Sequence, residues 1–221
     1  MADLSGTPVT LILIVINVFV FGYATFVDAG IIGRLSFRPR QILDRKEWYR
    51  FISAGFAHQE LWHIAFNMLT LYFFGPLLEA RFIDVFGPWL GIVMYMVLYF
   101  GSELTAHALT MYYHKDDPYY SAIGASGAVS GIVFAFCLYQ PFAMLGIMFV
   151  IPMPAILFAI LYVVGSIYAM KRSQRGGAMG RIAHEAHLGG AIGGLLLTIL
   201  IDPQSVEIFL YRVETFLQSI L

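Results

Sequence analysis

Residues 182–201 read IAHEAHLGGAIGGLLLTILI, a stretch of twenty residues in which only His184, Glu185 and His187 can ionise. About 20 predominantly apolar residues in a helix are enough to cross the hydrocarbon core of a bilayer. Glycines four residues apart, such as Gly190 and Gly194, lie on one helix face and allow another helix to approach closely. This stretch therefore predicts a membrane span with a tightly packed glycine face.

The whole chain shares this apolar character. Its 221 residues are 59% hydrophobic and 12% charged, whereas a soluble domain carries about 25% charged residues. A net charge of −1 offers no basic surface for nucleic acid. Cys137 is the single cysteine, which excludes a disulfide framework and a cysteine-ligated metal cluster. A polytopic, all-α membrane protein is the class that remains, and a soluble enzyme, a disordered chain and a nucleic-acid binder are excluded.

Apolar run lengths and the polar breaks between them predict six transmembrane helices in one bundle. These spans cover residues 8–27, 61–80, 86–113, 123–139, 142–170 and 182–201. Pro152 and Pro154 fall inside the fifth span, where we expect a bend or a broken turn. The predicted organisation is a six-helix membrane domain over residues 1–202, followed by a C-terminal helix over residues 203–221.

Two segments differ from ordinary loops. Residues 30–60 hold six of the 13 Lys and Arg residues, mixed with aromatic residues, which is typical of a segment at the membrane interface. The tail carries an apolar stripe at helical spacing from Val206 to Leu221. This pattern predicts an amphipathic helix, which either lies in the membrane interface or docks on the bundle.

Polar side chains inside a bilayer are costly, so each one within a span needs a physical reason. His63 and Asn67, at i and i+4, share one face of the second span. Taken alone, such a pair can equally form an interhelical hydrogen bond that holds the bundle together.

The sequence Gly124-Ala125-Ser126-Gly127 begins the fourth span. Serine among small residues is ordinarily a packing residue. Ser126, however, falls in the first turn of a helix, where free N–H groups and the helix dipole favour negative charge. His187 stands at the head of the glycine face of the sixth span, where a lone histidine is most often structural.

The order of the spans changes this balance, because the second, fourth and sixth spans all begin on the same side of the membrane. His63, Ser126 and His187 each fall within the first six residues of their span. At 1.5 Å per residue they lie within about 10 Å of the same surface. Because these residues and Asn67 share one depth on one side of the membrane, we favour one common functional site over four separate structural roles.

With these motifs in this order, the chain resembles the rhomboid family of intramembrane serine proteases over nearly its whole length. The resemblance rests on His63-x-x-x-Asn67, Gly124-Ala125-Ser126-Gly127, and Ala186-His187 with Gly190 and Gly194. Weaker matches are Trp48-Tyr49-Arg50, His58, and Gly75 with Glu79.

The resemblance implies a Ser–His dyad with Ser126 as nucleophile and His187 as general base. The Ser126 backbone N–H, His63 and Asn67 would stabilise the oxyanion. Gly124, Gly127, Gly190 and Gly194 are expected to serve close packing. The first loop would lie partly in the membrane, and the fifth span would be the mobile element beside the substrate. Transmembrane protein substrates and the lipid bilayer are the expected partners, with no nucleic acid, cofactor or metal, and no signal indicates an oligomeric state.

Other functions remain open at this point. An intramembrane metalloprotease would need H-E-x-x-H, and His184-Glu185-Ala186-His187 is one residue short of it. A non-catalytic rhomboid-fold protein would bind membrane clients without cutting them. A small transporter has one hint, the i, i+4 pair Glu103 and His107, which we expect near the wet end of the third span.

Charge and resemblance disagree about orientation. Eleven of the 13 Lys and Arg residues precede or follow spans on the Ser126 side, and only Arg81 and Arg212 fall on the other. The positive-inside rule then predicts that the dyad opens towards the cytoplasm with both termini outside. Rhomboid resemblance implies an opening towards the exterior or lumen. Because no appended domain or targeting segment is visible, we expect a multi-pass protein of a bacterial inner membrane.

Overall fold

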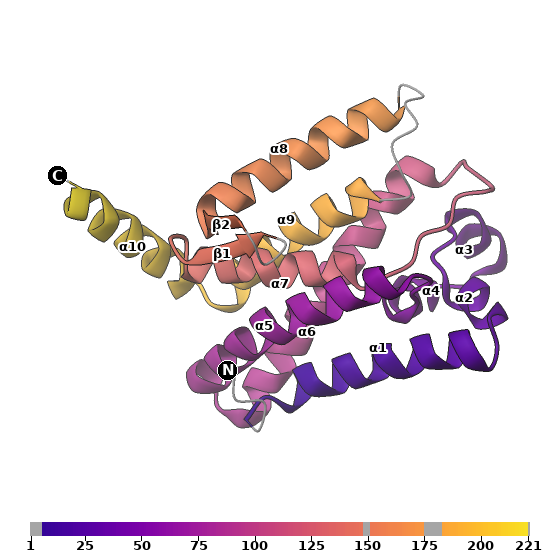
Figure 1. The fold of residues 1–221 in the computed structure, drawn as a ribbon, viewed down its shortest axis with the longest axis horizontal. Coiled ribbons are helices and arrows are strands. Elements are labelled where there is room, and N and C mark those ends of the chain that lie inside the picture. Colours follow the sequence, from indigo (N-terminus) through magenta and orange to yellow (C-terminus); the bar gives the residue numbers. More distant parts are fainter. Residues whose placement is uncertain (1–5, 148–150, 175–182, 221) are drawn as a thin grey trace.

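The computed structural model describes residues 6–147, 151–174 and 183–220 (Figure 1). The predicted beginning of the last span at Ile182 and the loop cations Arg175 and Arg181 lie outside these ranges. The same holds for the first five residues of the predicted membrane domain and for Leu221.

Six helices of the described residues make up the bundle. They are α1 (Pro8–Phe26), α5 (Leu61–Phe86), α6 (Pro88–His114), α7 (Ser126–Tyr139), α8 (Ala155–Gln174) and α9 (His184–Ile201). Among the described residues, α1, α5, α6 and α9 are long and apolar enough to cross a membrane, and α7 and α8 contain shorter apolar helices. The predicted class, an all-α polytopic membrane protein, is confirmed, and the count of six spans stays a prediction.

Helix α7 is the central helix. Its 14 residues extend about 21 Å at 1.5 Å per residue, less than the ~30 Å of a hydrocarbon core. Every residue after Ser126 is buried, because α5, α6 and α9 all pack against α7. A helix enclosed by other helices need not match the membrane thickness.

The second span is longer than predicted, because α5 continues past Ala80 to Phe86. Glu79 is completely buried, and its carboxylate accepts hydrogen bonds from the backbone N–H groups of Val9 and Thr10, each at 2.8 Å. A polar residue that is satisfied inside the bundle does not end a helix. It instead binds the first turn of α1, whose N–H groups have no intrahelical partner.

The fifth predicted span was wrong in its first part. Residues that we assigned to the start of a helix form an antiparallel hairpin of β1 (Met144–Ile147) and β2 (Ile151–Pro154). Two prolines at alternate positions, Pro152 and Pro154, remove the N–H donors that a helix needs and favour extended backbone before them. Helix α8 begins only after Pro154, and it runs alongside α9 in Figure 1.

The first loop is folded into short helices. These are α2 (Gly30–Leu35), α3 (Pro39–Arg45), α4 (Arg50–Ser53) and the 3-10 turn η2 (Ala54–Phe56). Arg50 does not reach lipid headgroups as a purely interfacial cation would. It is 4% exposed, its guanidinium donates to the carbonyls of Gly33 and Ser36, and it pairs with Glu47 at 2.6 Å. Arg50 therefore holds the loop together from inside.

The tail forms α10 (Gln204–Ile220), which extends away from the bundle in Figure 1. Its first turns contact α7 and α9, and the Phe216 ring stacks on Phe142 with centroids 4.0 Å apart. Most of its other side chains are exposed. The helix therefore contacts the bundle as far along as Phe216 while most of its side chains stay exposed, which combines features of both interpretations of the tail.

Candidate active site

The first loop holds the segment that leads to Ser126 in an extended form. Phe37 and Ala122 exchange two backbone hydrogen bonds, of 2.9 and 3.0 Å. The Gly124 backbone N–H donates to the Ala54 carbonyl at 2.9 Å. These bonds fix where the chain enters α7, whose first residue is Ser126.

Gly124 meets two demands that only glycine satisfies. Its φ of +113° lies in a region that L side chains rarely adopt. A Cβ at this position would also stand 2.5 Å from Cε1 of His63. The His63 ring therefore rests directly on the Gly124 backbone, two residues before Ser126.

The beginning of α7 is capped from another helix. Ala125, at the N-cap position, has no side-chain oxygen, and the Ala128 backbone N–H donates to Oε2 of Glu103 at 2.9 Å. Glu103 and His107 are 2% and 4% exposed, so both side chains are enclosed by the bundle. The buried carboxylate supplies the acceptor that an orphan helix N–H requires.

His107 connects this capping group to the first loop. Its Nε2 lies 3.5 Å from Oε1 of Glu103, and its Nδ1 is 2.8 Å from the Phe51 carbonyl oxygen. The Phe37 ring stacks on it with centroids 4.2 Å apart. The pair predicted as a hint of a proton relay thus supports the start of α7.

Glycines allow α7 and α9 to touch through their backbones. A Cβ on Gly190 would stand 2.0 Å from the Gly127 carbonyl oxygen, and one on Gly194 would stand 2.2 Å from Cα of Gly131. Ser126 adjoins Gly127, and His187 precedes Gly190 by one helical turn. Ser126 and His187 therefore belong to helical turns that lie against each other.

Aromatic and imidazole rings surround His187. The Tyr162 ring, from α8, is roughly parallel to it with centroids 6.3 Å apart, and the Tyr162 hydroxyl lies 2.6 Å from Oγ of Ser130. The His63 ring is close enough to interact electrostatically with His187. Among the described residues, no hydrogen bond joins Oγ of Ser126 to the His187 ring.

Asn67 is buried and points to His58. Its Nδ2 lies 3.1 Å from Nε2 of His58, and the Ala125 backbone N–H donates to the same nitrogen at 3.4 Å. Burial lowers the pKa of His58 to about 3, with a smaller contribution from the nearby His63. The neutral ring accepts at Nε2 and carries its proton on Nδ1.

A small cavity of about 10 Å³ opens between Ser126 and Glu103, bounded also by residues of α9 such as Ala186. This is about the volume that one water molecule needs. Oε1 of Glu103 has no hydrogen-bond partner. Both Ser126 and the polar side chain of Glu103 therefore line this cavity.

Glu185, the acidic residue of the sequence that resembles a metalloprotease motif, forms hydrogen bonds to other side chains. The Glu185 carboxylate accepts a hydrogen bond from the Tyr120 hydroxyl at 2.6 Å and lies 3.0 Å from Nε2 of His114. It therefore binds side chains that are not part of the His184–His187 pair. Within the described residues, no group of three or more possible ligands could hold a metal ion.

Sequence reasoning missed the roles of two groups in this region. Tyr162 lies in an apolar span, where an aromatic residue carries no signal that distinguishes it from core packing. His58 was a weak motif match, and nothing in the sequence showed that its ring would contact Asn67. The i, i+4 polar spacing of Glu103 and His107 was visible, but not the contact of Glu103 with α7.

The fold and these contacts define a class of protein: a polytopic membrane protein in which polar residues of α5, α7 and α9 gather at one end of the bundle. Residues 45–204 match the model of the Rhomboid domain. The chain therefore belongs to the rhomboid family, whose members are generally intramembrane serine proteases.

Curated relatives agree with this assignment. The chain is 30% identical over 150 residues to the mitochondrial RHOMBOID-like protein 12 of Arabidopsis thaliana, which covers 65% of this chain and 43% of that protein. It is 30% identical over 153 residues to the mitochondrial Rhomboid protein 1 of Saccharomyces cerevisiae, with 66% and 39% covered. A segment of 86 residues is 30% identical to the putative rhomboid protease YdcA of Bacillus subtilis, with 39% and 38% covered.

The chain spans about two fifths of the length of these relatives. Two of the three bear mitochondrial names, which does not fit the expectation of a bacterial inner membrane. What the comparisons and the apolar helices support is an integral membrane protein.

Proposed function

We propose that this protein is an intramembrane serine endopeptidase that cleaves transmembrane segments of membrane proteins with Ser126 and His187. One observation carries the proposal. The glycine contact between Gly127 and Gly190 sets the turn that bears Ser126 against the turn that bears His187. Close approach of the two backbones is what a two-residue catalytic unit on separate helices requires.

In this mechanism the Ser126 hydroxyl attacks the scissile carbonyl while His187 accepts its proton. His187 then donates the proton to the leaving amine, and a water molecule hydrolyses the acyl-enzyme by the same route. In apo enzymes such hydrogen bonds are often long and tighten only when substrate is bound.

The oxyanion would be stabilised by the Ser126 backbone N–H at the beginning of α7, where the helix dipole favours negative charge. Asn67 and His63 would add side-chain donors. His63 lies against Gly124, and His58 orients Asn67. Both side chains are therefore held near the end of α7 that begins with Ser126.

Substrates are proposed to be transmembrane segments that unwind near Ser126. A helix hides its carbonyls in hydrogen bonds, so small and helix-breaking residues at the cleavage point should favour reaction. We further propose residues 1–202 as the membrane domain and 203–221 as an appended helix. The bacterial inner membrane stays a prediction, with the Bacillus relative in its favour and the mitochondrial names against it.

A cleavage assay with purified protein and a model transmembrane substrate tests this function. Ser126→Ala and His187→Ala should each abolish cleavage and agree within about tenfold, because the members of a dyad act as a unit. Ser219→Ala, an exposed serine on α10, is the matched control and should cleave normally. A fluorophosphonate should label the wild type and not Ser126→Ala.

Three outcomes would contradict the proposal. Full activity of Ser126→Ala would remove the nucleophile assignment. Activity that is lost on chelation and restored by Zn²⁺ would favour a metalloprotease. Substrate binding without cleavage by the wild type, under conditions where the protein is folded, would favour a client-binding protein.

A further inference from the structure

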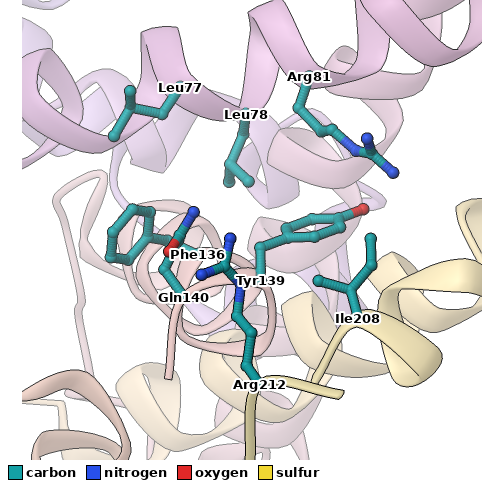
Figure 2. Close-up of a pocket in the computed structure, with 8 residues that line it drawn as sticks. All are labelled: Leu77, Leu78, Arg81, Phe136, Tyr139, Gln140, Ile208 and Arg212. Carbon is teal, nitrogen blue, oxygen red and sulfur yellow. The ribbon is translucent and has the colours of Figure 1, made fainter. Parts of the chain in front are cut away.

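A second cavity lies at the opposite end of α7 from Ser126. It has a volume of about 300 Å³ and is lined by residues of α5, α7 and α10 and by Gln140 (Figure 2). Tyr139, in its wall, is the last residue of α7 and thus stands about 20 Å along the helix from Ser126. The cavity is separate from the candidate active site, and binding of a ligand in it does not depend on protease activity.

One side of this cavity is apolar and the other carries cations. Leu77, Leu78, Phe136 and Ile208 form the apolar part. Arg81 and Arg212 approach from α5 and α10, and both are among the lining residues drawn in Figure 2. A hydrocarbon wall beside guanidinium groups suits a molecule that has both an apolar part and an anionic part.

The two arginines are the cations of this end of the chain. By sequence position, every other Lys and Arg falls in the first loop, between α6 and α7, or at and beyond the end of α8. Both cations of the α10 side thus line the same cavity.

The Arg81 guanidinium is only partly satisfied, because the carboxylate oxygen that it contacts is shared with Tyr139. Nη2 of Arg81 lies 3.1 Å from Oδ2 of Asp202, and the Tyr139 hydroxyl donates to the same oxygen at 2.8 Å. Nε of Arg81 is buried without an acceptor. No ion pair of Arg212 is found among the described residues. Nε of Arg81 and the Arg212 guanidinium are therefore donors without a carboxylate partner among the described residues.

We propose that this cavity binds an anionic glycerophospholipid, with its phosphate at Arg212 and Arg81 and one acyl chain against Leu77 and Ile208. Guanidinium groups form strong, charge-assisted hydrogen bonds to phosphate oxygens. A lipid supplies both the anion and the hydrocarbon, whereas a free phosphate ester leaves the apolar wall empty. Basic pockets between helices near a membrane surface are suited to anionic headgroups.

The size of the cavity agrees with a lipid bound in part. A volume of about 300 Å³ is at the lower end of the range for small-molecule pockets. It accommodates the phosphate, the glycerol and the beginning of one chain, and the remainder extends along the outer faces of α5 and α10. Leu77 is 50% exposed, so the cavity is open towards the surrounding bilayer.

Native mass spectrometry on the delipidated, detergent-purified full chain tests the proposal. Phosphatidylglycerol should bind about tenfold more tightly than phosphatidylcholine with identical acyl chains, because both lipids carry the phosphate but only phosphatidylcholine adds a choline cation beside the two guanidinium groups. Arg212→Gln should remove this preference, and Arg212→Lys should keep most of it. Arg40→Gln, an exposed cation in the first loop, is the matched control and should bind like the wild type.

Soluble sn-glycerol 1-phosphate provides the arm that separates a lipid from a free phosphate ester. It should bind at least a hundredfold more weakly, and Ile208→Trp, which fills the apolar part, should weaken lipid binding alone. The proposed site would be overturned if the wild type bound the two lipids equally or if Arg212→Gln kept the preference for phosphatidylglycerol. It would also be overturned if Arg40→Gln lost this preference as much as Arg212→Gln does. Tight binding of glycerol phosphate would replace the lipid with a soluble ligand.

Discussion

Nδ2 of Asn67 lies 3.1 Å from Nε2 of His58, and the Ala125 backbone N–H points to the same ring nitrogen at 3.4 Å. A nitrogen that accepts from a backbone N–H is unprotonated, so the Asn67 amide is the donor in this pair. One imidazole thereby joins the end of the first loop, the polar face of α5 and the residue that precedes Ser126.

Asn67→Ala should lower turnover about 10²-fold, as removal of a single oxyanion donor does in other serine enzymes. His58→Ala should lower it less, because that ring acts by orienting Asn67. The double variant should be no slower than Asn67→Ala, since the two effects share one route. Normal turnover of Asn67→Ala together with early unfolding would show that Asn67 only holds helices together.

The depressed pKa of His58 predicts a stability that depends on pH. An unfolded histidine titrates near 6.5, whereas His58 in the folded protein has a pKa of about 3. Above pH 6.5 the ring is neutral in both states; as the pH falls from 6.5 towards 3, the unfolded state alone gains a proton and stability is lost. Unfolding of the wild type and His58→Gln, measured from pH 7.5 to 4, should show a steeper loss in the wild type. Parallel curves would contradict this assignment.

Gly124→Ala should reduce cleavage at least tenfold while the protein stays inserted in the membrane. The new Cβ would collide with the His63 ring, and a φ of +113° is strained for alanine. Gly22→Ala, in α1, is the control, because its Cβ would meet nothing within 4 Å. Comparable cleavage by both variants would show that the backbone at Gly124 has no part in the site.

Glu103→Met should destabilise the protein by about 1–3 kcal/mol, the cost of leaving a buried N–H without an acceptor. The lost bond is that from the Ala128 N–H at 2.9 Å. Glu103→Gln keeps an acceptor oxygen and should stay close to the wild type in stability. Unfolding in SDS micelles measures the difference, and cleavage should fall with Met more than with Gln. Equal behaviour of the two variants would argue against the capping role.

Orientation is predicted from the distribution of cations. By sequence position, eleven of the 13 Lys and Arg residues fall in the predicted loops on the Ser126 side. The positive-inside rule then predicts that this side is cytoplasmic and that both termini are outside. A bacterial alkaline phosphatase fusion after Leu221 should then be active. A fluorescent fusion that matures in the cytoplasm at the same point would establish the opposite orientation, which is the one the rhomboid resemblance implies.

Short-range patterns were sufficient for the class of the protein. The apolar run lengths and the low charge indicated an all-α membrane protein, since only a helix or a closed barrel satisfies its backbone in lipid. The rhomboid resemblance rested on motifs whose residues are neighbours in sequence, and the Rhomboid domain match confirmed it. The pairing of β1 with β2 was missed because the apolar composition of these strands resembles that of a buried helix.

Only the tertiary structure decided which groups act on one another. The sequence shows that a polar side chain within a span needs a hydrogen-bond partner, but it does not show which one. The partner lies on another helix, at an unrelated position in the chain. Glu103 reaches the Ala128 N–H, Asn67 reaches His58, and Arg81 with Arg212 lines one cavity. The sequence by itself determined that this chain crosses a membrane as helices and carries the rhomboid motifs. Packing of those helices, which depends on glycine contacts such as Gly127 with Gly190, decided how the motifs meet.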